Sequence, residues 1–197
     1  MASKKKHVLA ELSKADYITC LSILLIVSAF WLLWNGQTHL PISITFVSMF
    51  LDYLDGRVAR KYGGSPYGKV LDSLYDILGW VLFPALVVNV QSNWAWWAIV
   101  TTTVYCLFAA IRLSRFTVSG YVETNKRYYA GMPVSYSRYP LLLVLLADAK
   151  ISALMLAMMV PLMVSSRLFK KSPPILMQIN LLYAGLFFWL FLNHGQI

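Results

Sequence analysis

The sequence predicts an all-α fold, a polytopic bundle of about seven transmembrane helices with the N-terminus in the cytoplasm. Three observations support this prediction. Of the 197 residues, 59% are hydrophobic and 13% are charged, whereas soluble domains carry roughly 25% charged residues. The apolar residues gather in seven stretches of near-bilayer length. The basic residues, which give a net charge of +9, gather in alternate connections between those stretches.

Each apolar stretch is long enough, or nearly so, to cross a membrane as a helix. The first, 17–34, would be about 27 Å long, close to the thickness of the hydrocarbon core. The other predicted helices cover 41–60, 68–90, 93–113, 132–147, 151–167 and 173–192. Asp148 and Lys150 favour a tight turn between the fifth and sixth helices over one long tilted helix.

The basic residues predict the orientation of these helices. Lys and Arg precede the first helix and fill the second, fourth and sixth connections, whereas the opposite connections carry only Lys150. Because short cytoplasmic loops collect Lys and Arg, the N-terminus is expected in the cytoplasm and the C-terminus outside. We therefore expect a basic interfacial segment, 1–16, followed by a single membrane domain, 17–197. The expected location is a prokaryotic cytoplasmic membrane, with the active site toward the cytoplasm.

Four of the eight acidic residues lie inside two of these apolar helices. Asp52 and Asp55 are three residues apart, and Asp72 and Asp76 four apart, so each pair occupies one helical face. The second helix runs toward the cytoplasm and the third returns from it, which places both pairs roughly 6 to 12 Å from the cytoplasmic helix ends. A carboxylate inside a membrane-spanning helix normally faces the bundle interior and marks a functional site.

The four carboxylates predict a cation site. Like charges close together in a low-dielectric interior cannot all ionise without compensating charge. Oxygen ligands favour Mg²⁺, Mn²⁺ or Ca²⁺ over Zn²⁺, so we expect one or two such ions. The alternative is polar packing against Arg57 or Arg60, which would explain one aspartate pair but not two.

The spacing of these residues resembles the signature of the CDP-alcohol phosphotransferase family of integral membrane enzymes. Eight fixed residues over 25 positions carry the resemblance: Asp52-x2-Asp55-Gly56-x2-Ala59-Arg60-x7-Gly68-x3-Asp72-x3-Asp76. The family usually has eight residues, not seven, between the arginine and the second glycine. That difference lies in the cytoplasmic turn and leaves the helical aspartates in place. The resemblance implies the family's six-helix core plus one further helix.

The resemblance also implies an activity, the transfer of a phosphatidyl group from a CDP-linked lipid to an alcohol with release of CMP. It implies two bound metal ions, Mg²⁺ or Mn²⁺, and a homodimer among membrane lipids. Asp52, Asp55 and Asp72 would hold one metal; Asp52, Asp72 and Asp76 would hold the second, and Asp76 would also be the general base. The CDP pocket would be lined by Gly56, Ala59, Arg60 and Gly68.

Two later segments bear on the acceptor alcohol. Residues 111–117 and 128–133 are similar to the RLARFN and FxGLP segments of phosphatidylserine synthases, with Ser114, Thr117 and Met132 as departures. This likeness implies CDP-diacylglycerol as donor and L-serine as acceptor. A guanidinium suits the serine carboxylate, and the candidates are Arg112, Arg115 and Arg138. Membrane topology or lipid headgroups explain Arg112 and Arg115 equally well.

Two alternatives stay open at this point. The same chemistry could use another acceptor, such as inositol phosphate, glycerol phosphate or choline. A cation transporter could use the same four aspartates, although no matching acidic pair occurs in the later helices. Nucleic-acid binding is not expected, because the basic residues are spread over several short loops.

Overall fold

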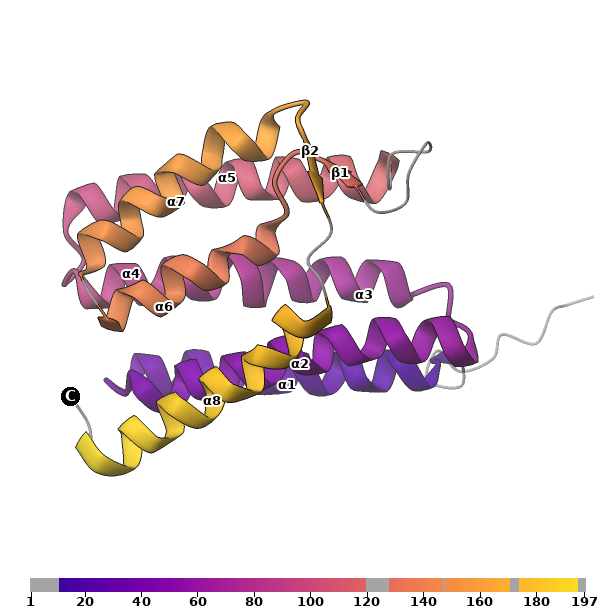
Figure 1. The fold of residues 1–197 in the computed structure, drawn as a ribbon, viewed down its shortest axis with the longest axis horizontal. Coiled ribbons are helices and arrows are strands. Elements are labelled where there is room, and N and C mark those ends of the chain that lie inside the picture. The colour runs from indigo at the N-terminus through magenta and orange to yellow at the C-terminus, as the bar shows by residue number, and fades with distance from the viewer. Residues whose placement is uncertain (1–10, 120–127, 147, 171–173, 195–197) are drawn as a thin grey trace, which may run out of the picture.

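The helices follow the predicted order along the chain (Figure 1). A computed structural model describes residues 11–119, 128–146, 148–170 and 174–194. The first two helices are α1 (Lys14–Trp34) and α2 (His39–Tyr62). The third is continuous from Gly68 to Gln91 and consists of α3 (Gly68–Tyr75), a π-helical segment (Asp76–Leu82) and α4 (Phe83–Gln91). The remaining four are α5 (Trp96–Ser119), α6 (Arg138–Leu146), α7 (Ala149–Val164) and α8 (Pro174–His194).

The helices pack in layers on either side of the Gly68–Gln91 helix. On one side lie α1 and α2, with α8 packed along α2; on the other lie α5 and α7, with α6 against α4 and α7 (Figure 1). Large buried side chains fill the interior, including Trp80, Phe46 and Tyr105. The structure over the described residues therefore confirms the all-α prediction with seven helices.

Three of these helices are long and apolar enough to cross a membrane by length and composition: Lys14–Trp34, Gly68–Gln91 and Trp96–Val118. Two further apolar stretches are shorter: α7 (Ala149–Val164) and the part of α8 over Gln178–Asn193. The 24-residue helix α2 is long enough, but it carries the two aspartates and several basic residues in its second half. These charged residues make α2 less apolar than the three candidate membrane spans.

The start of α1 differs from the prediction by three residues. Ser13 caps the helix: its hydroxyl accepts from the Asp16 N–H at 3.3 Å, and its own N–H donates to Asp16 Oδ2 at 2.5 Å. This reciprocal capping begins the helix at Lys14 instead of residue 17. Most of the predicted interfacial segment, residues 1–10, lies outside the described residues.

The fifth helix begins at Arg138, so the predicted start at residue 132 is wrong. Gly131 has a φ of 79°, and Pro133 is extended, which keeps the helix from starting there. A 3₁₀ turn over Val134–Ser137 then leads into α6. Arg138, which we expected well inside this helix, is therefore its first residue.

A short strand pair, which the apolar pattern does not predict, lies between these helices. Strand β1 (Tyr128–Ala130) pairs antiparallel with β2 (Leu168–Lys170), with Tyr129 opposite Phe169. The predicted sixth helix, 151–167, accordingly ends at Val164 to leave room for β2. The turn expected before it is confirmed, because Asp148 caps α7 by accepting from the Lys150 N–H.

Candidate active site

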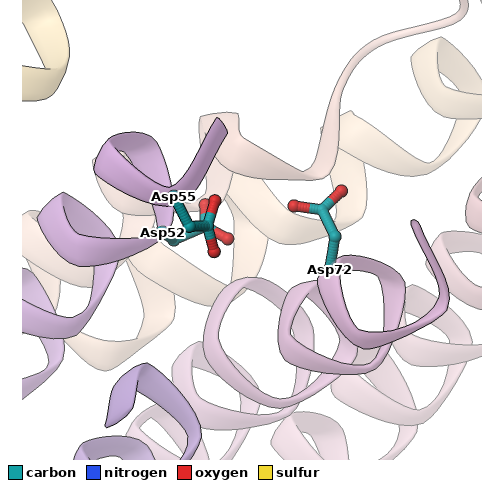
Figure 2. Close-up of side chains that lie close together, drawn as sticks. All are labelled: Asp52, Asp55 and Asp72. Atoms are coloured by element: carbon teal, nitrogen blue, oxygen red, sulfur yellow. The ribbon is translucent and has the colours of Figure 1, made fainter. Parts of the chain in front are cut away.

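Helices α2 and α3 bring three of the four predicted aspartates together. One carboxylate oxygen from each of Asp52, Asp55 and Asp72 lies within 4.8 Å of the other two. Figure 2 shows Asp52 and Asp55 side by side on α2, with Asp72 facing them from α3. We call these three residues the aspartate triad.

Asp76 lies next to the aspartate triad but is not part of it. It is the first residue of the π-helical segment, one turn beyond Asp72. All four carboxylates are close enough to interact electrostatically with one another, and Asp76 also interacts with the cationic Arg112. Asp76 thus lies near both the triad and an arginine.

The triad fits a divalent cation. Among the described residues, Asp52 Oδ1 is buried and has no hydrogen-bond partner, which is costly for a carboxylate oxygen away from water. Three carboxylates converging on one point supply the oxygen ligands and negative charge that Mg²⁺ or Mn²⁺ requires. A cation at this point would satisfy the buried oxygen and relieve the repulsion between the aspartates.

Two cavities meet at the triad. The first has a volume of about 240 Å³, and its lining includes Asp52, Asp76, Arg112 and Tyr129. The second, of about 440 Å³, extends between α1, α2 and the start of α3. Both cavities share five lining residues: Asp55, Gly56, Arg60, Asp72 and Phe116. Two molecules bound in the two cavities would therefore meet beside the carboxylates.

The second cavity contains all four residues that the family signature assigns to CDP, namely Gly56, Ala59, Arg60 and Gly68. Gly68 needs its small size, because a Cβ atom there would lie 3.1 Å from Asp16 Oδ1. A side chain at this position would press on a buried carboxylate at the cavity wall. The structure thus places the predicted nucleotide residues together on one surface.

The three candidate acceptor arginines lie in different surroundings. Arg112, which is 5% exposed, lines the first cavity, and its guanidinium lies 5.2 Å from the ring centroid of Phe116 and 5.5 Å from that of Tyr129. Arg138 is also buried, with its guanidinium over the ring of Trp80. Arg115 is exposed. Among the described residues, Arg112 is the one of the three that lines either cavity.

Comparison with known proteins identifies the family. The family model described as CDP-alcohol phosphatidyltransferase matches residues 12–192. This chain belongs to the CDP-alcohol phosphatidyltransferase family. It is therefore an integral membrane protein of a family that acts on CDP-linked alcohols, as the aspartate signature predicts.

Several curated relatives of this chain carry the name CDP-diacylglycerol–serine O-phosphatidyltransferase. The Methanocaldococcus jannaschii protein is 33% identical over 123 residues, which cover 61% of this chain and 54% of the relative. The Helicobacter pylori protein is 32% identical over 111 residues, covering 54% and 46%. The Saccharomyces cerevisiae protein is 30% identical over 138 residues, covering 63% and 50%. The matches span about half the length of these relatives.

The sequence did not predict several residues of this candidate site. Thr19 on α1 donates a hydrogen bond to Asp55, and Asp16 lines the second cavity. Trp80 and Phe116 line the first cavity, together with Tyr129 of β1. Only Phe116 and Tyr129 had a signal, because they fall in segments that resemble phosphatidylserine synthases. Thr19 looks like any polar residue in an apolar helix until its contacts are known.

A buried chain of hydrogen bonds links the helices that carry the aspartates. Tyr75, between Asp72 and Asp76 in the sequence, has its hydroxyl 2.7 Å from Ser48 Oγ of α2. Ser48 Oγ also lies 3.2 Å from the carbonyl oxygen of Ser22 in α1. These contacts join three helices at the level of the site, so they help to hold the aspartates in register.

Proposed function

We propose that this chain transfers the phosphatidyl group of CDP-diacylglycerol to the hydroxyl of L-serine, which forms phosphatidylserine and releases CMP. The observation that carries the proposal is the aspartate triad at the junction of two cavities. The family supports phosphatidyl transfer, and relatives named for serine support that acceptor.

The second cavity is the proposed donor site. The small side chains of Gly56, Ala59 and Gly68 leave room for the cytidine diphosphate, and Arg60 supplies a positive charge for its phosphates. The lipid tails would lie among the apolar helices. In this arrangement the phosphorus that carries diacylglycerol would lie beside the triad.

The first cavity is the proposed acceptor site. Arg112 would bind the serine carboxylate, and Asp76 would accept the proton from the serine hydroxyl. The serine oxygen then forms a bond to the phosphorus of the phosphatidyl group, and the bond from that phosphorus to the CMP oxygen breaks. Because Asp76 interacts with Arg112, a molecule bound to the arginine lies near the base.

The aspartates are also the proposed ligands for divalent cations. Asp52, Asp55 and Asp72 would hold one ion, and Asp52, Asp72 and Asp76 a second. When bound, Mg²⁺ or Mn²⁺ would neutralise the pyrophosphate and stabilise the leaving oxygen. The protein holds the ligands on two helices that are linked by buried hydrogen bonds, so their positions do not depend on a loop.

An acceptor panel tests the proposed substrate. Purified protein is incubated with labelled CDP-diacylglycerol, Mn²⁺ and one of serine, inositol phosphate, glycerol phosphate or choline, and CMP and labelled lipid are measured. We expect phosphatidylserine with serine and little product with the others. Turnover of another acceptor without serine turnover would reject serine. Cation flux into liposomes without CMP release would instead indicate transport.

The variant Asp76→Asn tests the proposed base. The amide cannot accept the hydroxyl proton, so turnover should fall at least roughly 100-fold, within the range of general-base contributions. Binding of CDP-diacylglycerol, measured by calorimetry in detergent, should largely persist because all four nucleotide residues line the second cavity, which Asp76 does not line. Full activity in this variant would exclude Asp76 as the base.

A further inference from the structure

A residue outside the family signature contacts the aspartate triad directly. Thr19 lies on α1, is 3% exposed, and has its hydroxyl oxygen 2.5 Å from Asp55 Oδ2 on α2. The contact joins α1 to α2 through two residues that are 36 positions apart in the sequence. It is thus a tertiary contact to a carboxylate that the metal site requires.

The hydroxyl proton of Thr19 has two possible acceptors. The carbonyl oxygen of Ala15, one turn earlier in α1, lies 3.2 Å away, longer than most O–H···O bonds. The distance of 2.5 Å between the Thr19 hydroxyl oxygen and Asp55 Oδ2 is typical of a hydroxyl that donates to a carboxylate. The proton is therefore directed to Asp55, and the helix carbonyl is the weaker partner.

The Asp55 carboxylate has room for a cation beside the contact with Thr19. A carboxylate has about four lone-pair positions, and the Thr19 hydroxyl occupies one of them. The Asp55 side chain is almost fully buried, and its orientation therefore depends on this hydrogen bond and on packing. The donor is contributed by another helix, α1.

We propose that Thr19 is a positioning residue that orients Asp55 for divalent-cation binding and so sets the affinity of the site. This inference rests on the metal site of the proposed function. Thr19 itself does not bind the cation in this scheme; it fixes the direction of a ligand. Partners of this kind typically contribute roughly 10- to 100-fold to metal affinity or activity.

The chain offers a matched control at Thr45 of α2. Thr45 is fully buried like Thr19, but its hydroxyl donates to the carbonyl oxygen of Pro41 in its own helix, at 2.8 Å. Replacing either threonine by valine preserves shape and removes a hydroxyl. The two variants therefore share the cost of the substitution but differ in contact with the metal site.

The test measures Mn²⁺ binding by electron paramagnetic resonance on full-length protein in detergent, without nucleotide. Thr19→Val should bind Mn²⁺ roughly 10-fold or more weakly. Thr19→Ser keeps the hydroxyl and should restore binding, and Thr45→Val should bind like the wild type. The Mn²⁺ concentration for half-maximal CMP release should rise in Thr19→Val, whereas the KM for serine should not change.

The outcomes separate this role from the proposed function. Thr19→Val with wild-type Mn²⁺ affinity contradicts the role of Thr19 and leaves the metal site intact. Equal losses in Thr19→Val and Thr45→Val, or no recovery in Thr19→Ser, also contradict it, because the effect would then be structural. A wild-type protein that binds no Mn²⁺ contradicts both the metal site and this inference. Size-exclusion profiles and melting temperatures without metal establish that each variant is folded.

Discussion

Burial distinguishes Arg112 from Arg115, although both fit the same sequence resemblance. Arg112 lies close to the rings of both Phe116 and Tyr129 and lines the first cavity, whereas Arg115 is exposed. Arg112→Lys keeps the charge but loses the planar guanidinium. We expect it to lower kcat/KM for serine by roughly 10-fold or more, the equivalent of about 1.4 kcal/mol. Arg115→Lys is the control, and equal effects in the two variants would remove Arg112 from the acceptor site.

Gly131 illustrates a residue whose backbone and neighbours both require glycine. Its φ is 79°, and a Cβ atom would lie 2.2 Å from the carbonyl oxygen of Met163. Gly131→Ala should therefore lower the melting temperature strongly, because backbone must move. Gly36 has a similar φ of 82° but open space around it, so Gly36→Ala should cost only about 1 to 2 kcal/mol from backbone strain. Equal melting temperatures for the two variants would contradict this packing.

The sequence predicts which residues belong to the site when their spacing places them on one face of a helix. The aspartates fall at helical intervals in apolar helices, so the cluster of Asp52, Asp55 and Asp72 could be expected before the structure was known. The close approach of Gly131 to Met163 could not, because it depends on a contact between segments more than 30 residues apart. The same holds for the contact of Thr19 with Asp55.

Between α3 and α4 the helix widens into a π-helical segment at the site. Trp80 in this segment has a carbonyl oxygen that accepts from the Tyr105 hydroxyl at 3.0 Å and from the Ser137 hydroxyl at 2.5 Å. Side chains from two other elements thus donate hydrogen bonds to a carbonyl oxygen in the widened turns. π-helical segments of this kind often occur at functional sites. Neither the apolar pattern nor the family signature predicts the widening, because both follow ordinary helical spacing.

The π-helical segment packs closely against Tyr75, and this packing can be tested at Gly79. A Cβ atom at Gly79 would lie 2.9 Å from the ring and hydroxyl of Tyr75. Tyr75 is buried, and its hydroxyl is hydrogen-bonded to the hydroxyl of Ser48. Gly79→Ala should displace Tyr75, cost about 1 to 3 kcal/mol and reduce CMP release. Gly185→Ala in α8 meets open space and is the control. Thermal unfolding and CMP release that match in the two variants would contradict the role of Tyr75.

At the scale of the molecule, the site and the exposed tryptophans lie toward opposite ends of the bundle. Trp31 and Trp34 end α1, and Trp94 and Trp96 lie where α4 turns into α5; all four are exposed. An exposed tryptophan belt is typical of a membrane interface. These positions fit a membrane interface at the end of the bundle opposite the site, and the cytoplasmic orientation of the aspartate end stays a prediction from the basic residues.

Fusions test this orientation in the full chain. Seven membrane crossings would place the C-terminus outside the cytoplasm. Alkaline phosphatase fused to the C-terminus should therefore be active, and green fluorescent protein fused there should not fluoresce. The reverse result would contradict the predicted topology. The homodimer implied by the family resemblance stays a prediction that light scattering in detergent can check.

The central claim is that the aspartate triad is the metal centre of a serine phosphatidyltransferase. Its most direct test is CMP release by EDTA-stripped protein, with CDP-diacylglycerol and serine present, as Mn²⁺ is added back. We predict no release without Mn²⁺, a saturable rise as Mn²⁺ is added, and no rise in the Asp52→Asn, Asp55→Asn and Asp72→Asn variants. CMP release that survives EDTA, or a normal Mn²⁺ response in those three variants, would contradict the claim.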